Sequence, residues 1–235
     1  MYITMRPQTS LILVAALAGL AGTSSTLTVQ ADAGAFQTSQ APQTPQPPRP
    51  RGNLAPRART YTYFIEDGNV ADGYRRGDRD LATWALQAWE RHSGGTLRFV
   101  AASEASPRIR IKWVGAREGQ YGETVRAPGN RRASIVYIRP DTEALGPLIA
   151  EPARVDPLLR DSIVYLTCLH ELGHAIGLSH TSDERDIMYS FQFGGDIRAY
   201  FYHYRDQVKR REEIATSSGL SVNDIERIRT LFTGR

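Results

Sequence analysis

Cysteine and histidine are both scarce in this sequence. Among its 235 residues there are one cysteine, Cys168, and five histidines. A single cysteine cannot form a disulfide within the chain, so the folded part must be held chiefly by its apolar core. The chain length and the hydrophobic fraction of 41% suffice for one sizeable core.

Long apolar runs are also missing. A membrane-spanning helix needs about 20 apolar residues, whereas the N-terminal run 11–22 has twelve. Arg6 precedes this run, and Ala31-Asp32-Ala33 has the form of a cleavage site. Residues 1–33 are therefore predicted to be a secretory signal peptide, which implies a secreted, extracellular or periplasmic protein without stable membrane association. A retained membrane anchor is the alternative.

Residues 34–57 have few large apolar side chains and are rich in proline, glutamine and threonine. Such a segment cannot bury enough surface to offset its ordering entropy, so it is predicted to be a disordered linker or a short pro-segment. It also carries three units of the formal net charge of +4, on Arg49, Arg51 and Arg57. The remaining domain, 58–235, is close to neutral and has no nucleic-acid-binding motif, so no nucleic acid partner is expected.

The domain alternates between strand-like and helix-like patterns. Period-two alternation and aromatic or β-branched runs predict strands, and apolar residues at spacings of three and four predict helices. The predicted strands are Arg59–Ile65, Thr96–Ala101, Ile109–Trp113 and Ser134–Arg139, and the predicted helices are Asp78–His92, Arg160–Gly177 and Ser221–Phe232. Ser221 and Asp224 have the spacing of a capping box. This order predicts an α+β fold with one mixed or antiparallel sheet.

Three of the five histidines fall within eleven residues, HELGHAIGLSH, from His170 to His180. On a helix, His170 and His174 lie about 40° apart, and Glu171 lies on the same side. A third histidine on the next turn would lie too far along the axis, so the helix must end first. Gly177 tolerates the positive φ that such a reversal needs, and the chain could then bring His180 back.

Three imidazoles that meet at one point indicate a zinc site. Zinc binds histidine nitrogen at about 2.0–2.1 Å, and three protein ligands with one open position are typical of a catalytic zinc. Glu171 fits a general base that takes a proton from a zinc-activated water and passes it to the leaving amine. We therefore predict one catalytic Zn²⁺ held by His170, His174 and His180, with Glu171 as general base and acid.

The motif HExxHxxGxxH, with Met188 eight residues later, resembles the signature of the metzincin zinc metallopeptidases. Three further segments, Trp84–Phe99, Ile109–Trp113 and Leu220–Gly234, resemble the matrixin branch. The resemblance implies a twisted, mixed five-stranded sheet, three main helices and an active-site cleft. It also implies that Met188 forms a Met-turn below the histidines without binding metal.

The resemblance further implies a secreted endopeptidase, of a bacterial type, that hydrolyses proteins or peptides. Its substrate would lie extended along an edge strand of the sheet. By matrixin order, that strand contains Gly122, Glu123, Thr124, Val125 and Arg126. We expect a monomer.

The sequence departs from the family in several places. No histidine lies between His92 and His170, so a second, structural zinc is not expected, and calcium-binding loops are not evident. The linker has no cysteine, so a cysteine-switch latency cannot operate there. Cys168 is expected to face away from His170 as a small buried side chain. Ser190 stands where other metzincins have a metal-binding tyrosine.

The segment 191–219 is longer than the family pattern by about twenty residues. Its aromatic part, AYFYHY at 199–204, could be a lid or specificity wall near the cleft, or an extra helix packed on the domain; His203 is not expected to be a ligand. Two other functions stay open. One is a secreted binding or adhesion module with a structural zinc, which would have no use for Glu171. The other is a zinc amidase that acts on cell-wall peptides.

Overall fold

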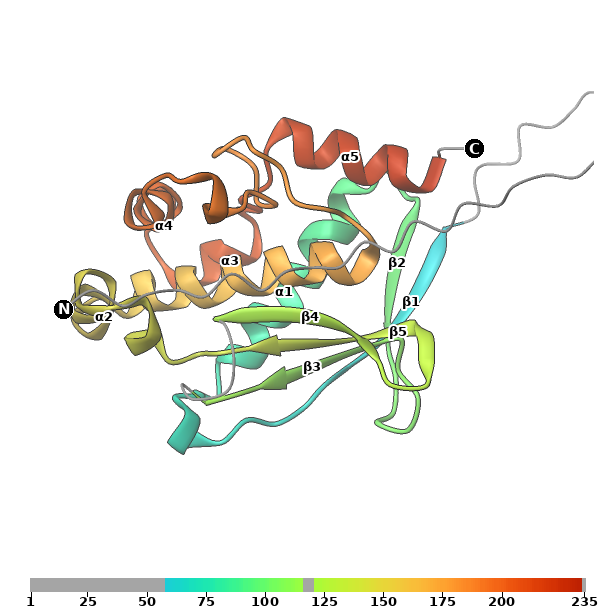
Figure 1. Ribbon diagram of the computed structural model, residues 1–235, viewed down its shortest axis with the longest axis horizontal. Helices are drawn as coiled ribbons and strands as arrows, with labels where there is room; N and C mark the ends of the chain where they lie inside the picture. Colours follow the sequence, from blue (N-terminus) through green and yellow to red (C-terminus); the bar gives the residue numbers. More distant parts are fainter. Residues whose placement is uncertain (1–57, 116–120, 234–235) are drawn as a thin grey trace, which may run out of the picture. The chain divides into compact units, whose positions relative to one another are not determined.

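The computed structural model describes residues 58–115 and 121–233 (Figure 1). The predicted signal peptide, 1–33, and the predicted linker, 34–57, lie outside the described residues. Within the described part, no helix is both long enough and apolar enough to cross a membrane.

One five-stranded sheet and five helices make up the described part of the domain. The strands are β1 Arg59–Ile65, β2 Leu97–Ala101, β3 Ile109–Trp113, β4 Gly122–Ala127 and β5 Asn130–Ile138. The helices are α1 Asp78–His92, α2 Pro147–Val155, α3 Pro157–Ile176, α4 Ile197–Arg205 and α5 Val222–Thr233. The strand order is β2-β1-β3-β5-β4; β4 is antiparallel to β5, and the other neighbours are parallel. The predicted mixed five-stranded α+β fold is therefore confirmed.

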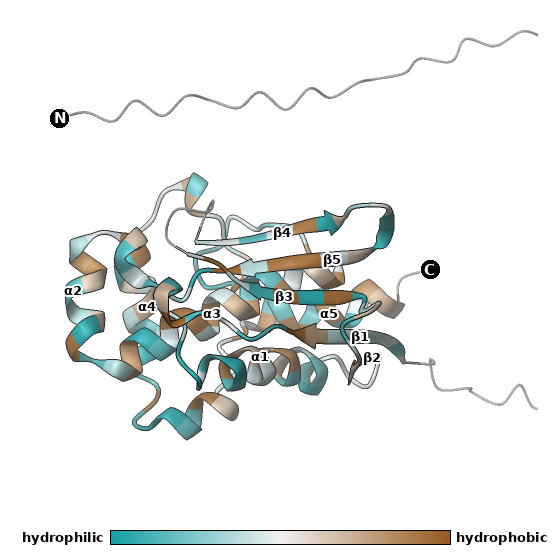
Figure 2. Ribbon diagram, turned by 90° about the horizontal axis from the view of Figure 1, so that it is seen from below, coloured by the Kyte–Doolittle hydropathy of each residue, from teal (hydrophilic) through white to brown (hydrophobic). Residues whose placement is uncertain are grey.

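The core lies between the sheet and the two long helices α1 and α3. Alternate residues of β3 and β5 are buried, and Figure 2 shows the apolar stretch of β5 between β3 and β4. The helices contact each other along their length, and the indole N–H of Trp89 on α1 donates to the carbonyl oxygen of Leu169 on α3 at 2.9 Å. This packing fixes α3, the helix that carries the histidine motif.

The structure corrects the predicted start of α3. The helix begins at Pro157, not at Arg160, because Asp156 caps it: one carboxylate oxygen of Asp156 accepts from the backbone N–H groups of Leu158 and Leu159. The short helix α2, which was not predicted, lies directly before it. Its prolines, at Pro147 and inside the helix at Pro152, concealed it because proline normally ends a helix.

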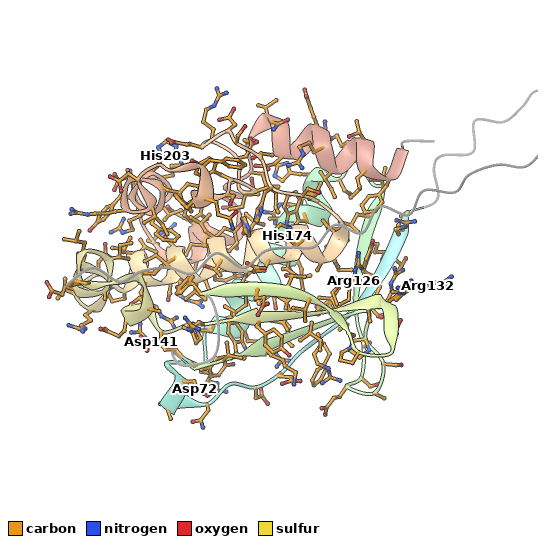
Figure 3. All side chains as sticks on the ribbon, in the orientation of Figure 1. Asp72, Arg126, Arg132, Asp141, His174 and His203 are labelled. Atoms are coloured by element: carbon orange, nitrogen blue, oxygen red, sulfur yellow. The ribbon has the colours of Figure 1, made fainter. Side chains whose placement is uncertain are left out.

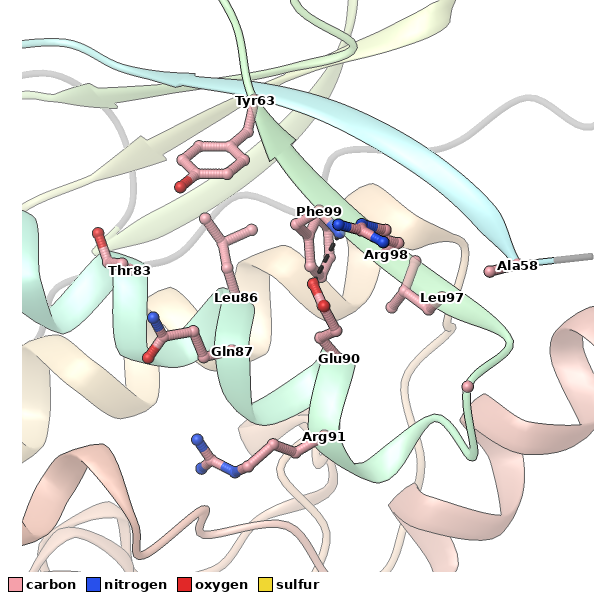
Figure 4. A pocket seen from close by; sticks show the side chains of 11 residues that line it. Ala58, Tyr63, Thr83, Leu86, Gln87, Glu90, Arg91, Leu97, Arg98 and Phe99 are labelled. Carbon is pink, nitrogen blue, oxygen red and sulfur yellow. Dashed lines mark hydrogen bonds between the residues drawn. The ribbon is translucent and has the colours of Figure 1, made fainter.

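The strand β2 forms the edge of the sheet opposite to β4, and one of its backbone N–H groups is hydrogen-bonded to a side chain. Glu90 of α1 accepts a hydrogen bond from the backbone N–H of Phe99 at 2.8 Å (Figure 4). A cavity of about 690 Å³ lies there, with Tyr63, Leu86 and Phe99 in its lining. The cavity shares no residue with the histidine motif, so we do not connect it with the predicted chemistry.

A buried ion pair joins α1 to α3. The side chains of Arg160 and Asp78 are 3% and 1% exposed. Nη1 of Arg160 donates to Oδ1 of Asp78, and Nη2 donates to Oδ2 at 2.8 Å. The same nitrogen donates to the carbonyl oxygens of Gly73 and Pro140, and Asp78 also accepts from the backbone N–H of Arg75. Every partner is internal, so the pair is well satisfied without water.

Removing one partner of this pair should be costly. We expect Arg160→Ala to lower the free energy of unfolding by about 3–5 kcal/mol, because it leaves the carboxylate of Asp78 buried without a counter-charge. Urea unfolding measures this loss. Arg154→Ala is the matched control, since its pair with Glu143 is about half exposed on both sides and should contribute far less. Equal losses in the two variants would show that burial does not decide the effect.

Candidate active site

Helix α3 has an apolar side and a polar side. The apolar stripe of Tyr165, Leu169, Leu172 and Ile176 is buried. The imidazoles of His170 and His174 lie on the other side and are only partly buried. One face of the helix therefore packs against the core, and the opposite face presents the histidines.

The helix ends at Gly177. Its φ of 114° lies in the left-handed region, and its N–H bonds to the carbonyl oxygens of Gly173 and His174. A side chain at this φ would be strained. The chain turns back here, so that the exposed His180 comes to rest beside the two helical histidines.

The three imidazoles converge through their Nε2 atoms. The Nε2 of His180 lies 3.0 Å from that of His174 and 3.3 Å from that of His170. The other ring nitrogen, Nδ1, is hydrogen-bonded to a backbone carbonyl oxygen in two of the histidines. Nδ1 of His170 lies 2.6 Å from the oxygen of Ile187, and Nδ1 of His174 lies 2.9 Å from the oxygen of Leu178. Because a neutral imidazole has one donor and one acceptor nitrogen, these bonds assign the proton to Nδ1 and leave the Nε2 lone pairs free.

This arrangement fits a zinc ion. Tetrahedral coordination at 2.0–2.1 Å spaces ligand nitrogens about 3.3–3.4 Å apart, close to the two distances between the Nε2 atoms. Within residues 58–115 and 121–233, these histidines are the one group of three or more His, Cys, Asp or Glu that could share a metal. Burial lowers the pKa of His170 to about 4, and it also lowers the pKa of His174 and His180. Neutral imidazoles are what metal binding requires.

Glu171 lies under the edge strand β4. Its side chain is 6% exposed, and Oε2 accepts a hydrogen bond from the hydroxyl of Thr124 at 2.8 Å. Burial raises the pKa of Glu171 to about 7; the negative charge of Glu123 adds to this, and the bond from Thr124 opposes it. A Cβ atom at Gly122 would lie 2.7 Å from Oε1 of Glu171. A glycine at this position therefore lets β4 pass directly over the carboxylate.

The strand β4 contains the segment 122–126 that the family resemblance assigned to substrate binding. It forms the outer edge of the sheet and pairs with β5 alone among the described strands. Gly122, Thr124 and Arg126 pair with inward-facing residues of β5, whereas Glu123 and Val125 face the opposite side. Thr124 thus has a contact with Glu171 that the sequence did not predict.

Met188 is fully buried directly beneath the histidine helix. A Cβ atom at Gly173 would lie 2.3 Å from its sulfur and 3.2 Å from the ring of Trp89. The residue before it, Ile187, supplies the carbonyl that holds His170. Gly173 was not singled out from the sequence, although its place between the two helical histidines was visible there.

The start of α5 holds this turn in place. Asp224 accepts from the backbone N–H of Ile187 at 2.8 Å and of Ser221 at 3.0 Å, and the hydroxyl of Ser221 accepts from the N–H of Asp224. The predicted capping box is therefore present. Its second role, as support for the residue that holds His170, was not predicted. Asp186 in turn accepts from Ser221 and Asn223, both at 2.6 Å.

The long segment before α5 forms an extra helix packed on the domain, which was one of the two predicted alternatives. Tyr204 of α4 is 3% exposed and stacks on Tyr165 of α3, with ring centroids 5.4 Å apart. Their hydroxyls donate to the carbonyl oxygens of Ser217 and Ser218. His203 is exposed on α4, away from His174 in Figure 3.

Cys168 is buried with 1% exposure, and burial raises the pKa of its thiol well above the ordinary value. Such a thiol is a poor nucleophile, because reactivity requires the thiolate. Its environment matches the small buried side chain that was expected.

Comparison with known proteins identifies the family. The sequence model of the Matrixin family matches residues 57–206, which is more than half of the chain. The chain therefore belongs to the matrixins, a family of zinc-dependent metallopeptidases. The resemblance that the histidine motif suggested is confirmed.

Individual relatives match smaller parts. Interstitial collagenase of Sus scrofa is 31% identical over 139 residues, which are 58% of this chain and 28% of that protein. A protein named chorismate synthase, from Aromatoleum aromaticum, is 29% identical over 130 residues, which are 53% of this chain and 31% of that protein. The chain thus spans less than a third of either relative, so the activity of neither whole protein is transferred to it.

Among solved structures, the GM1-bound form of the ECX AB5 holotoxin has a TM-score of 0.50 and 20% sequence identity. The match covers 73% of this chain and 79% of that chain. At this identity, the likeness concerns the fold alone.

The packing of Met188 against Gly173 predicts an unusual response to alanine. Inside a helix, alanine is normally better than glycine by about 1 kcal/mol. We expect Gly173→Ala instead to lower the free energy of unfolding by about 1–3 kcal/mol, because the new methyl group overlaps Met188 in a filled core. Thermal or urea unfolding decides the sign.

The Met188→Ala variant supplies the control for this test. In that background the added methyl group finds space, so Gly173→Ala should cost much less. A variant Gly173→Ala that is more stable than the parent would contradict the packing seen here.

The link from Asp224 to Ile187 predicts an effect on metal binding. Groups that orient metal ligands typically change metal affinity by about 10–100-fold when removed. Because Asp224 acts one step further away, we expect Asp224→Ala to weaken zinc binding about ten-fold, measured by competition with a chromophoric chelator. Glu226→Ala, an exposed change on the same helix, should leave the affinity unaltered. Equal zinc affinities in the two variants would show that Asp224 does not support the metal ligands.

Proposed function

We propose that this chain is a secreted zinc-dependent endopeptidase. The observation that carries the proposal is that the Nε2 atoms of His170 and His174 lie 3.3 and 3.0 Å from the Nε2 atom of His180, on a helix that also carries the buried carboxylate of Glu171. His170, His174 and His180 would hold the zinc ion. When bound, zinc would polarise the carbonyl of a peptide bond and lower the pKa of a water molecule.

The protein's own residues would then move the proton. Glu171 would accept a proton from the attacking water and deliver it to the nitrogen of the leaving amine. Thr124 limits the rotation of the carboxylate, because its hydroxyl lies 2.8 Å from both Oε2 and the backbone oxygen of Glu171. The carbonyls of Ile187 and Leu178 keep two imidazoles in the orientation and tautomer that metal binding needs.

The substrate would be a protein or peptide in extended form. Among the described strands, β4 pairs on one side only, so its outer edge offers backbone groups for strand addition. Thr124 brings that edge within hydrogen-bonding distance of Glu171. As part of the same proposal, residues 58–235 act as a monomeric catalytic domain, and residues 1–33 direct secretion.

The test uses the 235-residue chain and its Glu171→Gln variant. We expect both to bind about one zinc ion per chain, and only the parent to cleave casein and fluorogenic peptides. The variant should lose about 10²–10⁴-fold in kcat/KM, which is the range for removal of a general base. Glu226→Gln, on the exposed side of α5, is the control and should remain active.

Two results would point elsewhere. If both proteins bind zinc and neither cleaves any peptide, the ion serves a structural role in a binding module. If only cell-wall peptides are cleaved, the protein is an amidase, and the endopeptidase proposal is wrong.

A further inference from the structure

The register of β4 places three residues in a row on the face that lies over Glu171. Gly122 faces the carboxylate of Glu171, and Thr124 bonds to it. Arg126 follows on the same face, because it pairs with the buried, inward-facing Ser134 of β5. Two residues of a strand span about 6.8 Å. Arg126 therefore stands at a fixed offset from the position where a peptide bond would be cut.

Arg126 has room for a ligand. The helix α3 lies beside β4, with Thr167 next to Gly122 and Glu171 next to Thr124, so the two elements run in the same direction. The helix ends at Ile176, close to the level of Arg126. Arg126 is exposed, and Figure 3 shows it at the end of β4.

Positive charge collects at this end of the site. Arg132 is exposed on the β4–β5 hairpin (Figure 3), and Arg227 of α5 donates to the carbonyl oxygen of Ser179, just after α3 ends. Within the described residues, no carboxylate forms an ion pair with Arg126, Arg132 or Arg227. Other exposed arginines, for example Arg154 and Arg185, do form such pairs.

We propose that Arg126 is a specificity-determining residue that selects an acidic side chain in the substrate. This inference rests on the proposed endopeptidase function. A peptide added to β4 presents alternate side chains to the same face, so the residue opposite Arg126 is two positions from the residue opposite Thr124. If the peptide pairs antiparallel, as β5 does, the acidic residue lies on the amino-terminal side of the scissile bond.

The first experiment is a matched set of fluorogenic peptides. Starting from one cleaved peptide, Glu, Gln or Lys is placed in turn at each of several positions on both sides of the cleaved bond. At one position on the amino-terminal side, we expect kcat/KM to be about five-fold higher for Glu than for Lys at low salt, mainly through KM. A five-fold difference is the size expected when an exposed ion pair between Arg126 and Glu is replaced by repulsion between Arg126 and Lys. Added salt should reduce this difference.

Variants assign the preference to one residue. Arg126→Gln should remove it, Arg126→Glu should reverse it, and Arg126→Lys should keep most of it. Arg98→Gln is the matched control: it removes an exposed arginine from β2, at the opposite edge of the sheet, and should retain the preference. A preference that survives Arg126→Gln, or the absence of any charge preference at every position, would overturn the inference.

Peptide binding separates this inference from the endopeptidase proposal. Fluorescence anisotropy with the Glu171→Gln variant of the whole chain compares labelled peptides that carry Glu or Lys at the selected position. Tighter binding of the Glu peptide, lost on adding Arg126→Gln, supports the inference even if no cleavage is found. Equal binding of the two peptides, or no binding of either, overturns it.

Discussion

The end of α3 at Gly177 is the constraint on which the rest of the site depends. A helix rises about 1.5 Å per residue, so a sixth residue after His174 on a continued helix would lie about 9 Å away along the axis. The reversal instead brings Nε2 of His180 to 3.0 Å from that of His174. One positive φ thus converts a two-histidine helix face into a three-nitrogen site.

The reversal alone does not fix which nitrogen each imidazole presents. Leu178, the residue after the glycine, holds the Nδ1 proton of His174, and Ile187 holds that of His170. Ile187 is in turn held by Asp224 at the start of α5. The orientation of His170 therefore depends on three separate segments of the chain, and all of these contacts are to backbone groups.

Local patterns in the sequence predicted what local forces decide. The histidine spacing, the bounds of α1 and the capping box at Ser221 all depend on residues a few positions apart, and each is present in the structure. Two missed features depend on distant partners. The buried contact of Arg160 with Asp78 joins residues 82 positions apart, and Gly173 matters because Met188 packs on it. The helix α2 was missed because Pro147 and Pro152 imitate helix-breaking positions.

The strand β4 lies at the edge of the sheet and also contacts Glu171. An exposed edge is a risk for aggregation, which proteins commonly reduce by placing charges along it; here Glu123 and Arg126 lie on opposite faces of the strand. Gly122 and Thr124 keep that strand against Glu171. The register of a bound peptide would then be set by backbone pairing and the reacting point by Glu171. Arg126 lies two residues from Thr124 on the same face of β4. Its distance from the paired peptide backbone and from Glu171 would therefore be constant.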